Sequence, residues 1–102
     1  MAILALRHAL LENRLSPPLD AQVIQREAPT CTGSELRQLA DDLRNASDYW
    51  KDNGNKENAL RMGQWCGQMA SHVAGQDRAY LRGVEALIHG NIENDWGHYG
   101  TA

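Results

Sequence analysis

Residues 32–50, TGSELRQLADDLRNASDYW, carry the strongest helical pattern in the chain and set its fold class. The stretch opens on a capping box, in which the Thr32 hydroxyl and the Glu35 carboxylate each satisfy a backbone N–H that a helix start leaves unpaired. Gly54 is the expected stop. The apolar side chains recur at steps of three and four residues, which places them on one face: Leu36, Leu39, Ala40, Leu43, Ala46 and Trp50. The stretch therefore predicts a long amphipathic helix with one buried face.

Two further amphipathic helices are predicted downstream. The first spans 56–74, with a stripe of Ala59, Met62, Cys66, Met69, Ala70 and Val73. Large side chains line one edge of this stripe and Gly63 and Gly67 line the other, so we expect neighbours at two different distances. The second runs from an Asp77 cap to Gly90, and its expected buried face holds Tyr80, Leu81, Val84, Leu87 and Ile88. Short links between these helices favour antiparallel neighbours.

The N-terminal residues predict two shorter helices. One covers 3–15, and Ser16 then caps the other, with Pro17 in its first turn and Pro29 closing it. The predicted fold is all-α, a small helical bundle of three main antiparallel helices plus the two shorter N-terminal helices. We expect a single domain over 1–102, consisting of an N-terminal helical arm (1–28), a three-helix core (33–90) and a tail (91–102).

The first helix holds more apolar side chains than one packed face needs. Read at about 100° per residue, Ile3, Leu6 and Leu10 form one ridge and Leu4, Leu11 and Leu15 form a second. One ridge suffices for the core, and a leucine-sized side chain left in water forgoes about 1.5–3 kcal/mol. The other ridge is therefore expected to meet another protein chain. The predicted partner-binding residues are Ile3, Leu4, Leu6, Arg7, Leu10, Leu11, Arg14, Val23 and Ile24.

The composition and the sequence pattern argue against several classes of function. The net charge of −3 over 102 residues lacks the basic footprint of a nucleic-acid-binding protein. No apolar run approaches the roughly 20 residues of a membrane span, and the N-terminus makes a poor signal peptide. Cys31 and Cys66 fit neither a disulfide framework nor a zinc motif, which predicts free thiols in a reducing compartment. We expect a cytoplasmic protein.

Catalytic and metal sites find little support in the sequence. Cys66 and His72 are the one conceivable nucleophile–base pair of the core, and six residues on one helix correspond to about 9 Å of rise, too far for contact. His8 with Glu12 makes only two ligands, which is not a metal site. The acidic and histidine residues near the C-terminus are interrupted by glycines, so their spacing is not fixed. We predict no catalytic residue, no metal and no cofactor.

In size, acidity and helical content, the chain resembles the small acidic helical regulators of bacteria and their phages. Among these are antiactivators that bind LuxR-type quorum-sensing receptors. The resemblance implies a regulatory protein and transfers no residue. The residues themselves predict a non-enzymatic, homodimeric protein that binds and occludes a target protein through an apolar helical surface. The resemblance implies that this target is a transcriptional regulator.

An alternative function is a small helical enzyme or ligand-binding bundle, whose pocket would be lined by Trp50, Met62, Trp65, Met69 and Tyr80. A DNA-binding regulator is a third hypothesis. In the tail, Trp96 and Tyr99 would cover either the bundle or a partner. Capture of a protein partner would favour the interaction hypothesis, and a bound metabolite would favour the pocket.

Overall fold

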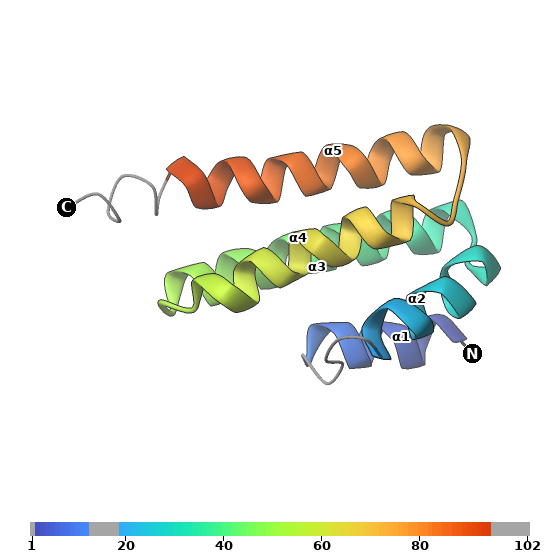
Figure 1. The fold of residues 1–102 in the computed structure, drawn as a ribbon, viewed down its shortest axis with the longest axis horizontal. Coiled ribbons are helices and arrows are strands. Elements are labelled where there is room, and N and C mark those ends of the chain that lie inside the picture. The colour runs from blue at the N-terminus through green and yellow to red at the C-terminus, as the bar shows by residue number, and fades with distance from the viewer. Residues whose placement is uncertain (1, 13–18, 95–102) are drawn as a thin grey trace.

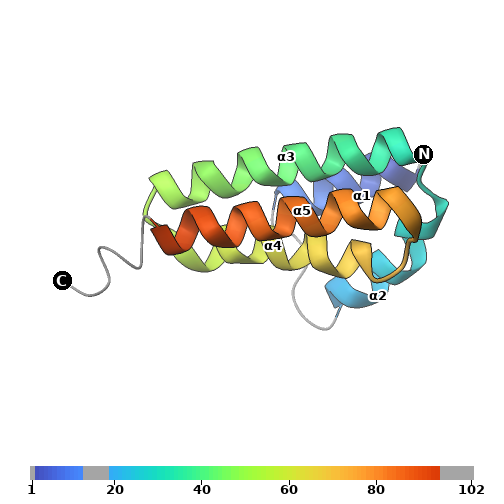
Figure 2. The ribbon, with the colours of Figure 1, turned by 90° about the horizontal axis from the view of Figure 1, so that it is seen from above.

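Three long helices form the frame of the molecule (Figure 1): α3 (Gly33–Asp52), α4 (Lys56–Ala70) and α5 (Gly75–Ile92). The computed structural model describes residues 2–12 and 19–94, with side chains from Arg7 onward. Consecutive long helices are antiparallel, so α3 and α5 run parallel to each other (Figure 2). The predicted all-α class is confirmed, since the described residues contain helices, turns and no strand.

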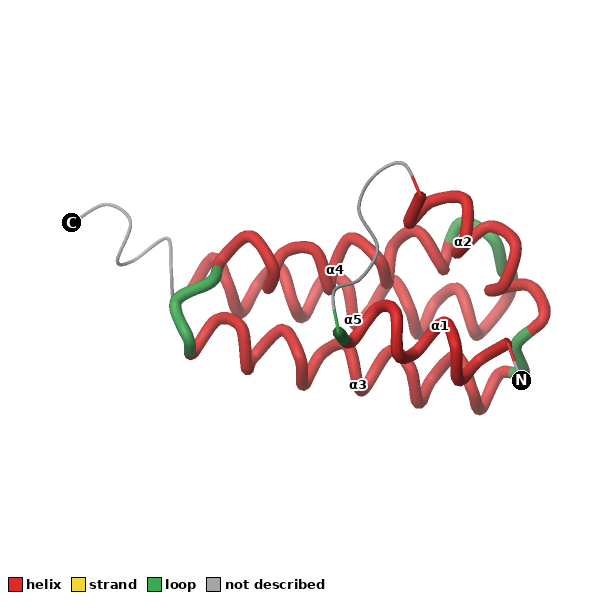
Figure 3. Tube along the Cα trace, turned by 90° about the horizontal axis from the view of Figure 1, so that it is seen from below, coloured by secondary structure: helices red, strands yellow, loops and turns green. Residues whose placement is uncertain are grey.

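Two short helices cover the side of α3 and α4 that lies away from α5 (Figures 1 and 3). They are α1 (Ala2–Leu11) and α2 (Leu19–Glu27), and a single 3-10 turn, η1 (Ala28–Thr30), leads from α2 towards α3. Helix α1 packs against α3, and α2 packs against α4. No described helix is both long enough and apolar enough to cross a membrane.

Local side chains cap the first turns of α3 and α4, which form an antiparallel pair. The capping box of α3 is confirmed, because Thr32 Oγ1 accepts from the Glu35 N–H at 3.2 Å and Glu35 Oε1 accepts from the Thr32 N–H at 2.8 Å. Gly54 adopts φ 79°, which favours glycine. The Asn55 side chain then accepts from the Asn58 N–H at 3.0 Å and caps α4. These contacts place the sharp reversal between α3 and α4.

The boundaries of α4 and α5 differ from the predicted ones. Helix α4 ends at Ala70, four residues before the predicted end, and α5 starts at Gly75, which adopts φ 65°. Asp77 is therefore inside the first turn of α5 and is not its cap. Its carboxylate instead lies 3.6 Å from the Arg37 guanidinium of α3. At its other end α5 continues past Gly90, because burial of Ile92 in the core extends the packed face by another half turn.

Close approach of α4 and α5 explains the two glycines on the small edge of α4. A Cβ atom on Gly63 would lie 2.8 Å from His89 Cδ2 and 2.9 Å from Ile88 Cγ2. A Cβ atom on Gly67 would overlap the Glu85 carboxylate. Since real Cβ atoms do not approach other atoms so closely, a larger residue at either position requires these α5 side chains to move. The close neighbour that the sequence predicts on this edge is therefore confirmed.

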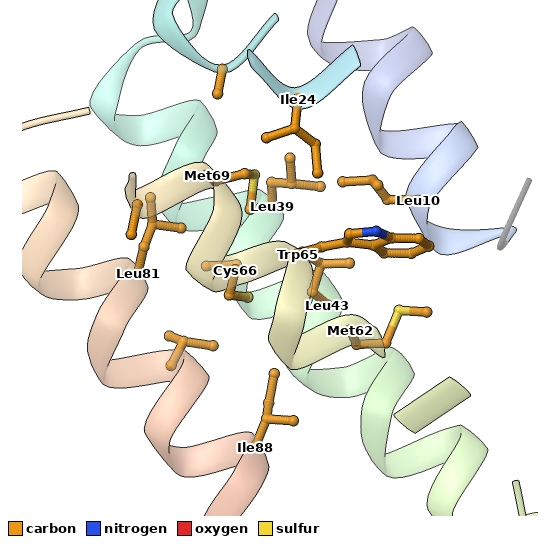
Figure 4. Packing of buried hydrophobic residues seen from close by; sticks show 14 of the residues in the cluster. Leu10, Ile24, Leu39, Leu43, Met62, Trp65, Cys66, Met69, Leu81 and Ile88 are labelled. Carbon is orange, nitrogen blue, oxygen red and sulfur yellow. The ribbon is translucent and has the colours of Figure 1, made fainter. Parts of the chain in front are cut away.

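The core spans all five helices, and Trp65 lies at its centre (Figure 4). Its indole packs among Leu10 of α1, Leu43 of α3 and Met62 of α4. The indole N–H donates to Asp20 Oδ2 of α2 at 3.0 Å, and both side chains are buried. A buried carboxylate and a buried indole need such partners, so this bond ties α2 to the bundle.

Candidate interaction face on helix α5

Two of the predicted partner-binding residues lie inside the protein's own core. Leu10 and Ile24 are fully buried, and they belong to the same cluster as Trp65. The expectation that they face another chain is corrected, because α1 and α2 fold back over α3 and α4 and cover them. The N-terminal helices are thus not a detached arm, since they share one core with the long helices.

Of the other predicted partner-binding residues, those with described side chains make contacts within this chain. Arg7 Nε lies 2.7 Å from Asp42 Oδ2 of α3. Leu11 and Val23 are half-buried and pack against the core. Four members of the set lie outside the described side chains, namely Ile3, Leu4, Leu6 and Arg14. The described side chains of the two apolar ridges, Leu10 and Leu11, therefore pack within this chain and are not left for a partner.

Cys66 is placed where a thiol is chemically inert. Its side chain is fully buried between α4 and α5, and burial raises its pKa to about 12, with Glu85 and Asp41 adding to the shift. The nucleophile of a catalytic thiol is the thiolate, which this environment disfavours. His72, the base considered with it, lies exposed in the turn after α4.

Thiol labelling is expected to separate the two cysteines. Near neutral pH, Cys31 should react with a thiol reagent in the folded protein, whereas Cys66 should react only after unfolding in urea. Stability that depends on the neutral Cys66 thiol is present below pH 9.0, the ordinary thiol pKa, and is lost as the pH rises towards about 12. Equal labelling rates for the two thiols in the folded protein would contradict this burial; a Cys31→Ser variant isolates the Cys66 signal.

Among the described residues, the side chains predicted to line a ligand pocket do not gather around one cavity. Met62, Trp65 and Met69 are fully buried and fill the core, while Tyr80 lies outside it. Within 2–12 and 19–94, no three histidine, cysteine or acidic side chains gather closely enough to hold a metal ion. His8 Nδ1 and Glu12 Oε1 lie 3.3 Å apart on the exposed side of α1.

The outer side of α5 is a different kind of surface. Along the helix, residues separated by three, four and seven positions fall on one side, and on α5 this side carries no charge. We call it the α5 face: Gln76, Ala79, Tyr80, Gly83, Ala86, Leu87 and Gly90. All are exposed except the half-buried Gly90. Leu87 leaves 47% of its surface in solvent and Tyr80 leaves 36%.

Charged residues of α5 point away from this face, towards the neighbouring long helices. Asp77 lies beside Arg37 of α3. Arg78 Nε donates to the Ala70 carbonyl at 3.0 Å, and Arg82 donates to Ser71 Oγ at 3.3 Å at the end of α4. Helix α5 therefore does contain charged residues, but they lie on its other sides and leave the α5 face uncharged.

A groove of about 500 Å³ runs between the α5 face and α3. Asp41 and Arg44 stand on its α3 wall, and Tyr80, Gly83 and Leu87 line its α5 wall. The Tyr80 hydroxyl donates to Asp41 Oδ1 at 2.7 Å, which raises the pKa of the phenol. The Arg37 guanidinium lies 5.6 Å from the centre of the Tyr80 ring. These contacts hold Tyr80 in place as a rigid aromatic edge of the groove.

No contact among the described residues requires glycine at the two glycine positions of the α5 face. A Cβ atom on Gly83 or Gly90 would meet no atom of the described residues within 4 Å, in contrast to Gly63 and Gly67. Glycine inside a helix costs about 0.5–1 kcal/mol relative to alanine. Gly83 therefore weakens α5 without relieving any contact within the chain.

The prediction that Tyr80 and Leu87 lie on the buried face of this helix is wrong. Leu81, Val84 and Ile88 are buried, while Tyr80 and Leu87 flank them on the solvent side. A signal that could have separated them is composition, since Tyr80 and Leu87 share their side of the helix with Gln76, Ala79, Gly83 and Ala86, whereas the other side holds Leu81, Val84 and Ile88. Comparison of the chain with family models, characterised proteins and solved structures gives no match.

Proposed function

We propose that this chain is a non-enzymatic regulatory protein that binds a target protein and occludes the target's own interface. The observation that carries the proposal is the α5 face with its adjoining groove, an exposed and uncharged helical surface that the fold leaves uncovered among the described residues. Apolar patches of this kind mark contact sites on small proteins. A target such as a transcriptional regulator, acting in the cytoplasm, fits the two free thiols and the acidic helical character of the chain.

The mode of binding that the surface supports is a helix laid along a groove. The groove offers Tyr80 as a fixed aromatic edge and Leu87 as an exposed apolar anchor. A buried leucine or aromatic side chain contributes about 1.5–3 kcal/mol relative to the exposed state, and such anchors dominate helix-in-groove complexes. Asp41 and Arg44 on the opposite wall supply one charge of each sign for orientation.

A charge at Leu87 is expected to abolish target binding while the fold remains intact. Leu87→Glu places a carboxylate in the centre of the groove, where burial against a partner costs far more than exposure to water. Leu19→Glu is the matched control, because Leu19 on α2 leaves 51% of its surface exposed. We would immobilise the wild-type chain and both variants and quantify by mass spectrometry the proteins retained from native lysate.

The expected result is one protein, different from this chain, retained by the wild type and by Leu19→Glu and reduced at least tenfold by Leu87→Glu, which corresponds to a loss of about 1.4 kcal/mol. Circular dichroism verifies that all three chains are equally helical. Equal retention by Leu87→Glu would remove the α5 face from the proposal. Release of a metabolite in place of a protein would overturn the interaction function.

A further inference from the structure

We propose that a second copy of this chain occupies the α5 face when no target is bound. In this contact, two α5 helices cross antiparallel, with Gly83 of each copy on the two-fold axis. The inference rests on the proposed function, in that it takes the α5 face to be an interaction surface, and it adds the identity of one occupant. The contact is isologous, as in most symmetric dimers, so each residue of the face must fit its own face in reverse order.

The α5 face meets this requirement. With Gly83 at the centre, antiparallel pairing places Leu87 opposite Ala79 of the second copy, and Tyr80 opposite Ala86 of the second copy. Each large side chain thus meets a small one, as knobs fit into holes. At the ends of the contact, Gln76 lies opposite Gly90 of the second copy. Spacings of three, four and seven residues keep all these positions on one seam over 76–90.

The proposed dimer explains why position 83 is a glycine. Beyond its own helix, no atom in residues 2–12 and 19–94 lies within 4 Å of where its Cβ atom would be, yet glycine in mid-helix destabilises the helix. On a two-fold axis, the absence of a side chain allows the two backbones to approach closely. This is the role that Gly63 and Gly67 have inside the molecule, where a Cβ atom would collide with α5.

Electrostatics favour a neutral partner surface, and the α5 face is itself neutral. Its seven residues carry no formal charge, and the adjoining wall of the groove carries Asp41 and Arg44, whose charges are opposite. A strongly acidic or basic helix would find no net complement there. Two copies of this chain, each with a net charge of −3, place uncharged surface against uncharged surface and keep their other charges in water.

The size of the contact sets its strength. The seam from 76 to 90 is about 21 Å long at the rise of an α-helix. A contact along one helix lies at the small end of specific interfaces, below about 1,200 Å². We therefore expect a dimer that dissociates in roughly the micromolar range, which leaves the face accessible to a target.

Analytical ultracentrifugation of the full chain tests the contact directly. The wild type is expected to shift from monomer to dimer as its concentration rises through the micromolar range. Gly83→Leu should weaken the dimer at least tenfold, because two leucines on the axis force the helices apart. The same variant should melt at a higher temperature than the wild type, since leucine favours the helix and meets open space in the monomer. Gln64→Leu, which adds the same side chain on an exposed position of α4, should leave the dimer unchanged.

Disulfide trapping tests the register. Cα atoms must lie within about 7 Å to be bridged, so Gly83→Cys, in a Cys31→Ser background, should form an intermolecular disulfide upon mild oxidation. Gln76→Cys should not, because antiparallel pairing places the two copies of this residue about 21 Å apart. Cys66 is fully buried and does not interfere.

A wild type that remains monomeric throughout, or efficient trapping of Gln76→Cys, would overturn the inference. Neither result affects the proposed function, for which the loss of target capture in Leu87→Glu is the separate measurement. A wild-type dimer together with unchanged capture by Leu87→Glu would instead support the self-contact and remove the target from this face.

Discussion

Replacing Trp65 with alanine is expected to lower the free energy of unfolding by about 3–5 kcal/mol, which is a large fraction of the stability of a domain of this size. The indole is fully buried at the point where α1, α3 and α4 meet, so its removal leaves a cavity that no single helix can close (Figure 4). The substitution also leaves Asp20 Oδ2 without its buried donor. An acceptor orphaned in this way adds to the cost of the cavity.

Urea denaturation followed by circular dichroism measures this effect. Trp65→Phe separates its two causes, because phenylalanine keeps most of the ring volume and removes only the N–H donor. We expect it to cost less than Trp65→Ala and more than Asn45→Ala, a substitution on the exposed side of α3. A midpoint for Trp65→Ala close to that of the wild type would show that the indole is not central to the core.

Leu10→Glu is expected to release α1 from the bundle and to lower the unfolding free energy by several kcal/mol. Leu10 is fully buried beside Trp65, so a carboxylate there would lose its hydration inside an apolar cluster. From the sequence, this substitution would be expected to weaken binding and to leave the fold intact. The structure reverses that expectation, because the side chain belongs to the core.

Hydrogen exchange of the α1 amides, together with the urea midpoint, distinguishes release of α1 from global unfolding. Leu10→Met is the matched control, because a swap of similar volume in a core costs less than about 1.5 kcal/mol. Leu19→Glu introduces the same charge at an exposed position and should leave the free energy of unfolding within about 0.5 kcal/mol of the wild type. If Leu10→Glu behaved like Leu19→Glu, α1 would not pack on α3 and α4 as described.

The frame of the fold could be predicted from sequence because its determinants are local. The capping box at Thr32 and the stripes of α3 and α4 lie within single helices, and the periodicity of an α-helix is sufficient to identify them. Even the close crossing of α4 and α5 left a local signal, in the two glycines that share one edge of α4. The predicted helix boundaries were less accurate where two residues could each start a helix. Asp77 was the predicted cap of α5, but the helix starts at Gly75, which adopts a positive φ.

The positions of the candidate functional residues could not be predicted from local pattern. Leu10 belongs to one of the two apolar ridges of the first helix, and only the docking of α1 on α3 decides that Leu10 is buried. The bond from Trp65 to Asp20 joins residues 45 positions apart, so no periodicity reveals it. Leu87 sits at the border of a wide apolar stripe, and whether such a residue is core or surface depends on how closely α3 approaches α5.

The order of contacts along the chain also bears on how the molecule assembles and opens. Helices α3, α4 and α5 contact mainly their neighbours in sequence, which is typical of fast-folding domains. Helices α1 and α2 must instead return to α3 and α4, and they bring the Asp20 carboxylate to the Trp65 indole. We therefore expect the N-terminal helices to open as a unit before the long helices do. Because this opening moves the carboxylate away and lets water reach the ring, tryptophan fluorescence would report it as an early transition, distinct from the loss of helix.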